Sequence, residues 1–95
     1  MRSNDRPLRD VVQELLKKYK LEDHIGETRI IENWGKTVGP MIAAHTGNLS
    51  VKNQVLYVTV DSSALRQELL YRKESLLTLL NKAAERELIK EIVFR

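Results

Sequence analysis

Cysteine is absent from this sequence, and aromatic residues are scarce: it has one tryptophan, one phenylalanine and three tyrosines. Without cysteine the chain cannot form disulfides, thiolate metal sites or a cysteine nucleophile, and this composition fits a reducing compartment. No apolar run exceeds four residues, whereas a membrane-spanning helix needs about 20 apolar residues. We therefore expect a cytoplasmic chain that makes no membrane contact, with residues 1–95 forming one small domain.

The charged residues give a net charge of +3 and a pI near 9.3. This mild basic excess is compatible with a nucleic acid or an acidic protein as partner. Neither His24 nor His45 has an acidic or histidine residue at a metal-binding spacing. Most carboxylates stand beside basic residues, as Glu68 does four residues before Arg72, which is typical of exposed helical ion pairs. The sequence thus predicts no metal site, no cofactor and no enzymatic activity.

A change of hydrophobic period marks the centre of the chain. Apolar and polar residues alternate over residues 55–60, as expected for a strand with one buried side. The residues of the buried side are Leu56, Val58 and Val60. Asp61 and Ser62 come next, and either side chain can accept a hydrogen bond from the first amides of a helix. The sequence therefore predicts a strand followed directly by a helix.

The helix that follows carries more apolar surface than one neighbour can cover, so we expect it to lie between a sheet and another helix. Its apolar arc consists of Leu65, Leu69, Leu76, Leu80 and Ala83, widened by Leu70, Leu77 and Ala84. On a straight helix Arg72 points into this arc, where a guanidinium is costly to bury. The stretch Tyr71–Glu74 is therefore predicted to be a kink or a break between two helices, with Ser75 as a possible cap of the second.

Two further strands complete the expected sheet. A two-residue turn at Asn53-Gln54 places a preceding strand opposite the central one, with one shared apolar face. The resulting pairs are Val51 with Leu56 and Leu49 with Val58. Gln54 stands where glycine is favoured, so a longer loop is the alternative. The apolar segment from Leu88 to Phe94 predicts a third strand, which a helical crossover returns parallel to the central strand.

The first helix is expected to begin at a cap formed by Asn4 or Asp5, with Pro7 in its first turn and a flexible stretch at residues 1–5. Its apolar residues recur at helical spacing: Leu8, Val11, Val12, Leu15, Leu16 and Tyr19. Three cations mark its expected far end: Lys17, Lys18 and Lys20. They either complement the carboxyl end of the helix dipole as a solvated helix end or form a basic binding patch.

A second helical face runs through residues 21–45 and consists of Ile31, Trp34, Val38, Met41 and Ile42. The pair Gly39-Pro40 is predicted to end one helical segment and to open a short one, because proline can begin a helix but cannot continue it. We interpret Trp34 as a core anchor and not as a ligand platform. The expected core anchors are Trp34, Leu56, Val58, Leu65, Leu69, Leu76, Leu80, Ile92 and Phe94.

Five short segments, in their order and spacing, carry a resemblance to a known family. They are Trp34–Gly39 (WGKTVG), Ile42–Thr46 (IAAHT), Leu56–Ser63 (LYVTVDSS), Glu68-Leu69 and Ile92–Phe94. Together they resemble the DciA family of bacterial replicative-helicase loaders or operators, over nearly the whole chain. The resemblance implies an α+β fold similar to the type II KH domain. It consists of N-terminal helices, a β-hairpin, one kinked or two paired helices and a final strand, with helices on one face of a three-stranded sheet.

The resemblance also implies a function. It is that of a non-enzymatic DNA-replication factor, with possible nucleoid association, that binds the replicative DNA helicase and, weakly, single-stranded or forked DNA. The KH phosphate-gripping loop GXXG falls at Tyr71–Glu74, which has no glycine, so side chains must make any phosphate contact there. The candidate nucleic-acid-binding residues are Arg66, Arg72, Lys73, Lys17, Lys18 and Lys20.

Other interpretations stay open at this point. The charges of Arg72 and Lys73 can equally belong to a solvated loop that serves solubility. A KH-like module that binds RNA or the ribosome is a second class of function, for which Tyr57 and Tyr71 are the reasonable stacking rings. A third class is a protein-only adaptor that uses the open sheet face or an edge strand.

Overall fold

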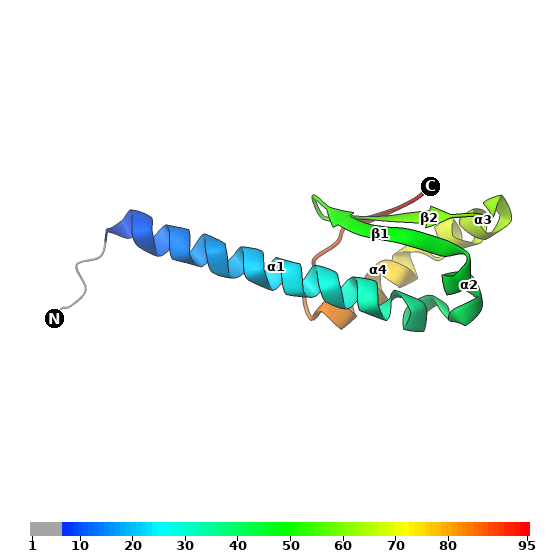
Figure 1. The fold of residues 1–95 in the computed structure, drawn as a ribbon, viewed down its shortest axis with the longest axis horizontal. Coiled ribbons are helices and arrows are strands. Elements are labelled where there is room, and N and C mark those ends of the chain that lie inside the picture. The colour runs from blue at the N-terminus through cyan, green and yellow to red at the C-terminus, as the bar shows by residue number, and fades with distance from the viewer. Residues whose placement is uncertain (1–6) are drawn as a thin grey trace.

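A computed structural model describes residues 7–95, and Figure 1 shows its fold. The cap expected at Asn4 or Asp5 and the flexible stretch expected for residues 1–5 lie outside the described residues. The described chain is α+β, as predicted, with helices and a three-stranded sheet. Its elements are α1 (Leu8–Val38), α2 (Pro40–Ala44), β1 (Thr46–Lys52), β2 (Val55–Val60), α3 (Ser63–Tyr71), α4 (Lys73–Ala84) and β3 (Glu91–Phe94).

Helix α1 is one continuous helix of 31 residues, where the sequence suggested separate segments. No proline interrupts it, and a helical glycine costs only about 1 kcal/mol relative to alanine, so Gly26 and Gly35 do not end it. It ends at Gly39, whose positive φ of 92° suits glycine, and Pro40 opens α2 as predicted.

The continuity of α1 corrects the interpretation of the three lysines Lys17, Lys18 and Lys20. They stand in the middle of a long helix and not in its last turn, where the basic residue is Lys36. The helix dipole acts only within the terminal turns. The explanation of this cluster as a dipole-paired helix end is therefore wrong.

The first half of α1 projects from the rest of the molecule (Figure 1). Every residue from 8 to 22 is exposed, and the chain extends 63 Å along its longest axis but 20 Å along the other two. The radius of gyration is 17.5 Å, whereas a compact chain of this length has about 12 Å. The molecule thus consists of a small body, formed by residues 23–95, and a protruding helical stretch, residues 8–22.

The second half of α1 packs on the body through Gly26, Ile30 and Trp34, which are buried. Gly26 allows a close approach, because a Cβ atom at this position would lie 2.9 Å from Cδ2 of Leu88. Trp34 links α1 to the sheet, since its Nε1–H donates to Oγ1 of Thr46 at 2.8 Å.

Ion pairs reinforce the same junction of α1 with the end of α4. Arg29 pairs with Glu85, and Arg86 pairs with Asp23 at 2.8 Å. All four side chains are partly exposed, so each pair is worth at most about 1 kcal/mol. Apolar packing therefore contributes most of the attachment of α1.

The sheet has the order β1-β2-β3, with β1 antiparallel and β3 parallel to β2, as predicted. The hairpin turn is the predicted two-residue turn: Asn53 and Gln54 both have positive φ, 51° and 66°. The expected pair of Val51 with Leu56 forms. The expected pair of Leu49 with Val58 is wrong, because a bulge shifts the register between Gly47 and Ser50.

The two helices after the hairpin are separate, as one of the alternatives for residues 71–74 predicted. Ser62 caps α3, since its Oγ accepts from the N–H of Leu65 at 3.2 Å. Ser75 does not cap the second helix, because α4 begins two residues earlier, at Lys73. The N-cap position of α4 is Arg72, which makes no side-chain cap hydrogen bond.

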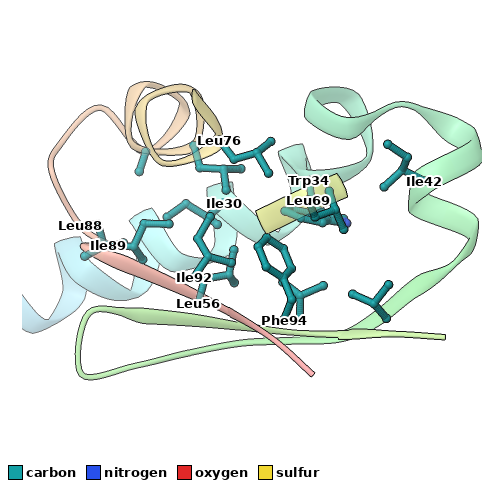
Figure 2. Close-up of a cluster of buried hydrophobic side chains, with 14 residues drawn as sticks. Ile30, Trp34, Ile42, Leu56, Leu69, Leu76, Leu88, Ile89, Ile92 and Phe94 are labelled. Atoms are coloured by element: carbon teal, nitrogen blue, oxygen red, sulfur yellow. The ribbon is translucent and has the colours of Figure 1, made fainter. Parts of the chain in front are cut away.

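The core lies between the sheet and the helices, which cover one face of the sheet (Figure 2). The residues expected as core anchors lie in this cluster, with Leu65 partly buried at its edge. Two members of the predicted second helical face, Ile31 and Met41, are exposed instead. They lie on the solvent side of α1 and α2, because each of these helices packs against the rest of the chain with its other side only.

The last strand is shorter than predicted. It begins at Glu91, whereas Leu88 and Ile89 are buried in the turn that precedes it. The side chain of Asn81 in α4 holds this turn: its Oδ1 accepts from the N–H groups of Leu88 and Ile89 at 2.9 Å, and its Nδ2 donates to the carbonyl of Ile89 at 2.8 Å. None of the helices in residues 7–95 combines the length and the hydropathy needed to cross a bilayer.

Candidate functional site

The junction of α3 and α4 is a break of one residue at Arg72, with φ −95° and ψ 4°. The N–H of Arg72 donates to the carbonyl of Leu69 at 3.1 Å, while its carbonyl accepts from the N–H of Leu76 at 2.9 Å. Arg72 thus ends one helix and starts the next. The break turns its side chain, which a straight helix would direct into the apolar arc, toward solvent, where it is half exposed.

The guanidinium of Arg72 is held by Glu68 across one helical turn. Its Nη2 lies 3.1 Å and its Nε 3.2 Å from Oε1 of Glu68, as the spacing of four residues predicted. Both side chains are about half exposed. An exposed pair of this kind is worth about 0 to 1 kcal/mol, so a phosphate can compete with Glu68 for the guanidinium.

The ammonium of Lys73 is bound across the molecule to Glu91, at 3.0 Å. The hydrogen bond from Lys73 lowers the pKa of Glu91 below its ordinary value, and the backbone N–H of Ile92, 2.8 Å away, acts in the same direction. Lys73 therefore ties the start of α4 to the start of β3. Its charge is compensated within the chain, as that of Arg72 is.

Arg66 has a structural position on α3. Its Nη2 donates to the carbonyl of Val60 at 3.0 Å, at the end of β2. Its Nε is buried and makes no hydrogen bond to any other described residue. The side chain is therefore directed to the strand end and not freely available to a phosphate.

The remaining candidates, Lys17, Lys18 and Lys20, lie on the projecting half of α1 (Figure 1). All three are exposed, and within residues 7–95 none of them forms an ion pair. The structure thus separates the six sequence candidates into two groups. One belongs to the protruding helix and the other to α3 and the α3–α4 junction of the body.

A shallow groove of about 360 Å³ opens between α2 and α3. Its lining residues are Met41, His45, Ser62, Ala64, Leu65 and Glu68. Met41 is 68% exposed and forms an apolar side of the groove, whereas polar and charged groups stand at its margin: Nδ1 of His45 lies within hydrogen-bond distance of Oδ1 of Asp61, at 3.0 Å, and Glu68 pairs with Arg72. This is an apolar surface with a charged rim, and we call it the α2–α3 groove.

Sequence reasoning missed the α2–α3 groove, although a signal for part of it exists. The hairpin register pairs Thr46 with Val60. Extending this register by one residue brings His45 opposite Asp61, and the backbone N–H of Asp61 does donate to the carbonyl of His45 at 3.1 Å. The exposure of Met41 had no such signal, because helical periodicity placed it on the buried face.

The two tyrosines considered for base stacking differ in availability. The ring of Tyr57 lies under the guanidinium of Arg95, 4.8 Å from the ring centroid, on the sheet. Tyr71 is 80% exposed beside Arg72. Of these two rings, Tyr71 is the one that a base could reach. Among the described residues, no three His, Asp or Glu side chains gather into a possible metal site.

Comparisons with known proteins match this chain from its first helix to its last strand. Residues 7–94 match the family described as "Dna[CI] antecedent, DciA". A "UPF0232 protein" of Mycobacterium marinum is 31% identical over 71 residues, which are 75% of this chain and 38% of that relative. The chain thus spans well under half the length of this relative. Because the family match takes in every helix and strand described above, from α1 to β3, the chain belongs to the DciA family.

Proposed function

We propose that this chain is a non-enzymatic accessory module of DNA replication that binds the replicative helicase. Membership of the DciA family over residues 7–94 is the observation that carries this proposal. Such a role belongs in the cytoplasm, at the nucleoid. Binding of the chain to the purified replicative helicase of the same cell, measured by calorimetry, tests it directly. Absence of binding at about 100 μM, a concentration that detects even weak complexes, would overturn it.

The α2–α3 groove is the helicase contact that the described surface supports best. Its apolar floor and charged rim have the composition of a protein interface, in which an apolar centre is surrounded by polar groups. Met41→Glu is expected to weaken helicase binding about 10- to 30-fold, the effect of losing an interface hot spot. Leu79→Glu is the matched control, because Leu79 is also an exposed apolar residue on a helix but lies on α4, outside the groove.

We also propose a weak, sequence-independent contact of the α3–α4 junction with single-stranded or forked DNA. Arg72 and Lys73 are held only by partly exposed ion pairs, so phosphates can replace Glu68 and Glu91 as their partners. The double variant Arg72→Glu/Lys73→Glu is expected to reduce the dependence of log Kd on log salt by about 1.4 for a single strand, or about 0.7 for each phosphate contact.

A control for this variant must change the charge by the same amount elsewhere. Lys36→Glu/Lys82→Glu does so at two exposed helical positions. If both double variants weaken binding equally, the junction has no special role and the effect comes from net charge. If the unsubstituted chain does not bind DNA even at low salt, the chain is a protein-only adaptor.

A KH-like RNA module is the second candidate function, and the exposed ring of Tyr71 beside Arg72 favours it. Stacking of a base on an aromatic ring is worth about 1–3 kcal/mol. Tyr71→Ala is therefore expected to weaken RNA binding at least fivefold if this candidate is correct. If the unsubstituted chain and the Tyr71→Ala variant each bind RNA and DNA equally well, the RNA candidate is wrong and the replication proposal stands.

A further inference from the structure

The projecting half of α1 carries an apolar face that nothing in residues 7–95 covers. Its residues are Leu8, Val11, Val12, Leu15, Leu16 and Tyr19, which are between 37% and 78% exposed. An isolated helix as short as this projecting half, residues 8–22, is only marginally stable in water unless its apolar face is packed. We therefore expect another molecule to cover this face.

The exposed apolar face continues the buried face of the same helix. Eighteen residues make about five full turns of an α-helix, so residues 8 and 26 point the same way, as do residues 12 and 30, and residues 16 and 34. Gly26, Ile30 and Trp34 are the residues of α1 that are buried against the body. One apolar stripe therefore runs along α1, and the body covers only its second half.

The spacing along the exposed stripe is symmetric. Its central seam is Leu8, Val12, Leu15 and Tyr19, with intervals of four, three and four residues. This sequence of intervals reads the same in both directions. In an antiparallel pair of such helices, Leu8 meets Tyr19 and Val12 meets Leu15, each of them twice. The four residues thus build four complete layers of the kind that form a coiled-coil seam.

We propose that this face binds a second copy of the same chain, with the two α1 helices antiparallel. The pairing uses residues 8–19 only, and α1 meets its own body from Gly26 onward. The two bodies then lie at opposite ends of the helix pair. Each copy covers the uncovered half of its partner's stripe.

The charges on the projecting helix favour the antiparallel direction. Lys17, Lys18 and Lys20 are concentrated in its second part, whereas the first part carries two acidic residues, Asp10 and Glu14, and one cation, Arg9. A parallel pair would set the three lysines of one copy beside those of the other, which is unfavourable. In the antiparallel pair the two lysine clusters lie apart; Asp10 and Lys17 both face away from the seam, so the preference comes from this separation and not from a contact between those two residues.

The area of the face sets the expected strength of the pair. The exposed fractions of the six apolar residues, applied to ordinary residue areas, give roughly 600 Å² of accessible surface on the face of each copy. A standard specific interface buries about 800 Å² on each partner, so this face is smaller than a standard one. We therefore expect a reversible dimer with a dissociation constant of about 1–50 μM.

Sedimentation velocity of the full 95-residue chain over a concentration series measures this equilibrium. Leu15→Glu places a charge in the seam and is expected to raise the dimer dissociation constant at least 100-fold. Gln13→Glu adds the same side chain about 160° away around the helix and is expected to change the constant less than threefold. A wild-type chain that stays monomeric at about 300 μM, or equal effects of the two variants, would overturn the proposal.

Disulfide formation tests the direction and register, because the chain has no cysteine of its own. A mixture of the variants Leu8→Cys and Tyr19→Cys is expected to oxidise mainly to the mixed dimer. Leu8→Cys alone is not, since the two copies of residue 8 lie about 16 Å apart along an antiparallel pair. Rapid cross-linking of Leu8→Cys to itself would indicate a parallel pair and refute the assignment.

The same face could instead receive a helix of a different protein, such as the helicase. In that case the chain alone is monomeric, and Leu15→Glu weakens helicase binding. That result overturns the dimer but supports the proposed function. Conversely, a dimer that does not bind the helicase supports this inference and contradicts the proposed function, so the two outcomes are distinguishable.

Discussion

Replacement of Asn81 by alanine is expected to destabilise the body strongly, although Asn81 is a polar residue at a half-buried helical position. Its side chain makes three hydrogen bonds to the backbone of Leu88 and Ile89, at 2.8 to 2.9 Å. Alanine removes all three bonds; the N–H of Leu88 keeps the carbonyl of Arg86, at 2.9 Å, whereas the N–H and carbonyl of Ile89 lose the Asn81 side chain. At about 1 kcal/mol for each bond, the loss is about 3 kcal/mol.

The higher helix propensity of alanine offsets about 0.6 kcal/mol of this loss, so the free energy of unfolding should fall by about 2.5 kcal/mol. For a domain of this size the change corresponds to a Tm lower by about 10–20 °C. Urea denaturation followed by circular dichroism measures it. Leu88 and Ile89 are buried and Leu88 faces Gly26, so the loss should also loosen the attachment of α1.

Asn33→Ala is the matched control for Asn81→Ala. Asn33 is also helical and its Nδ2 also donates to a backbone carbonyl, that of Arg29 at 2.8 Å, but this bond is exposed to water. Its replacement should change the free energy of unfolding by no more than about 0.5 kcal/mol. Equal effects of the two substitutions would show that the turn before β3 does not depend on the Asn81 side chain.

The remaining predictions concern an ion pair and two helical glycines. Lys73 lowers the pKa of Glu91 from 4.5, so the pair stabilises the fold above that pH, and its contribution is lost as the pH falls through the lowered pKa of the folded state. Glu91→Gln and Lys73→Met should each flatten this part of a urea-measured stability curve; an unchanged curve would refute the role of the pair. Gly35→Ala should raise the free energy of unfolding by up to about 1 kcal/mol, because a Cβ atom at residue 35 has no neighbour closer than 3.9 Å. Gly26→Ala should not, because Leu88 is in the way, and equal thermal shifts of the two variants would contradict this.

Features with a local physical cause could be predicted from the sequence. The alternation of apolar and polar residues over residues 55–60 predicted a strand, and the side predicted to be buried is the side that is buried in the structure. Ser62 caps α3 because its hydroxyl is placed at the start of an apolar period. The break at Arg72 followed from the cost of burying a guanidinium, and the observed junction avoids this cost.

Features that depend on contacts distant in sequence could not be predicted. The apolar period of residues 8–19 indicates a buried face, but it does not say whether the rest of the chain reaches that face. Nothing local shows that Lys73 meets Glu91, or that Asn81 holds the turn before β3. The bulge that displaces Leu49 contains Asn48, whose φ is positive at 49°, and the hydrophobic pattern does not reveal it.

The candidate contacts illustrate the same limit for function. Charge and sequence position selected Arg66, Arg72 and Lys73 as phosphate contacts. The structure provides each of them with a partner inside the chain: the carbonyl of Val60 for Arg66, and carboxylates for the other two. Sequence shows where cations are, whereas only the fold shows which of them are already engaged.

The parallel pairing of β3 with β2 has a consequence for synthesis of the protein on the ribosome. The hairpin of β1 and β2 can form as soon as it emerges, but the sheet closes only when Arg95, whose N–H and carbonyl bond Val58 and Val60, has been made. Until then Leu56 and Val58 lack one of their neighbouring strands. Nascent chains therefore expose a half-built layer until residues 91–95 have emerged, and products that stop before these residues should be good substrates for chaperones and proteases.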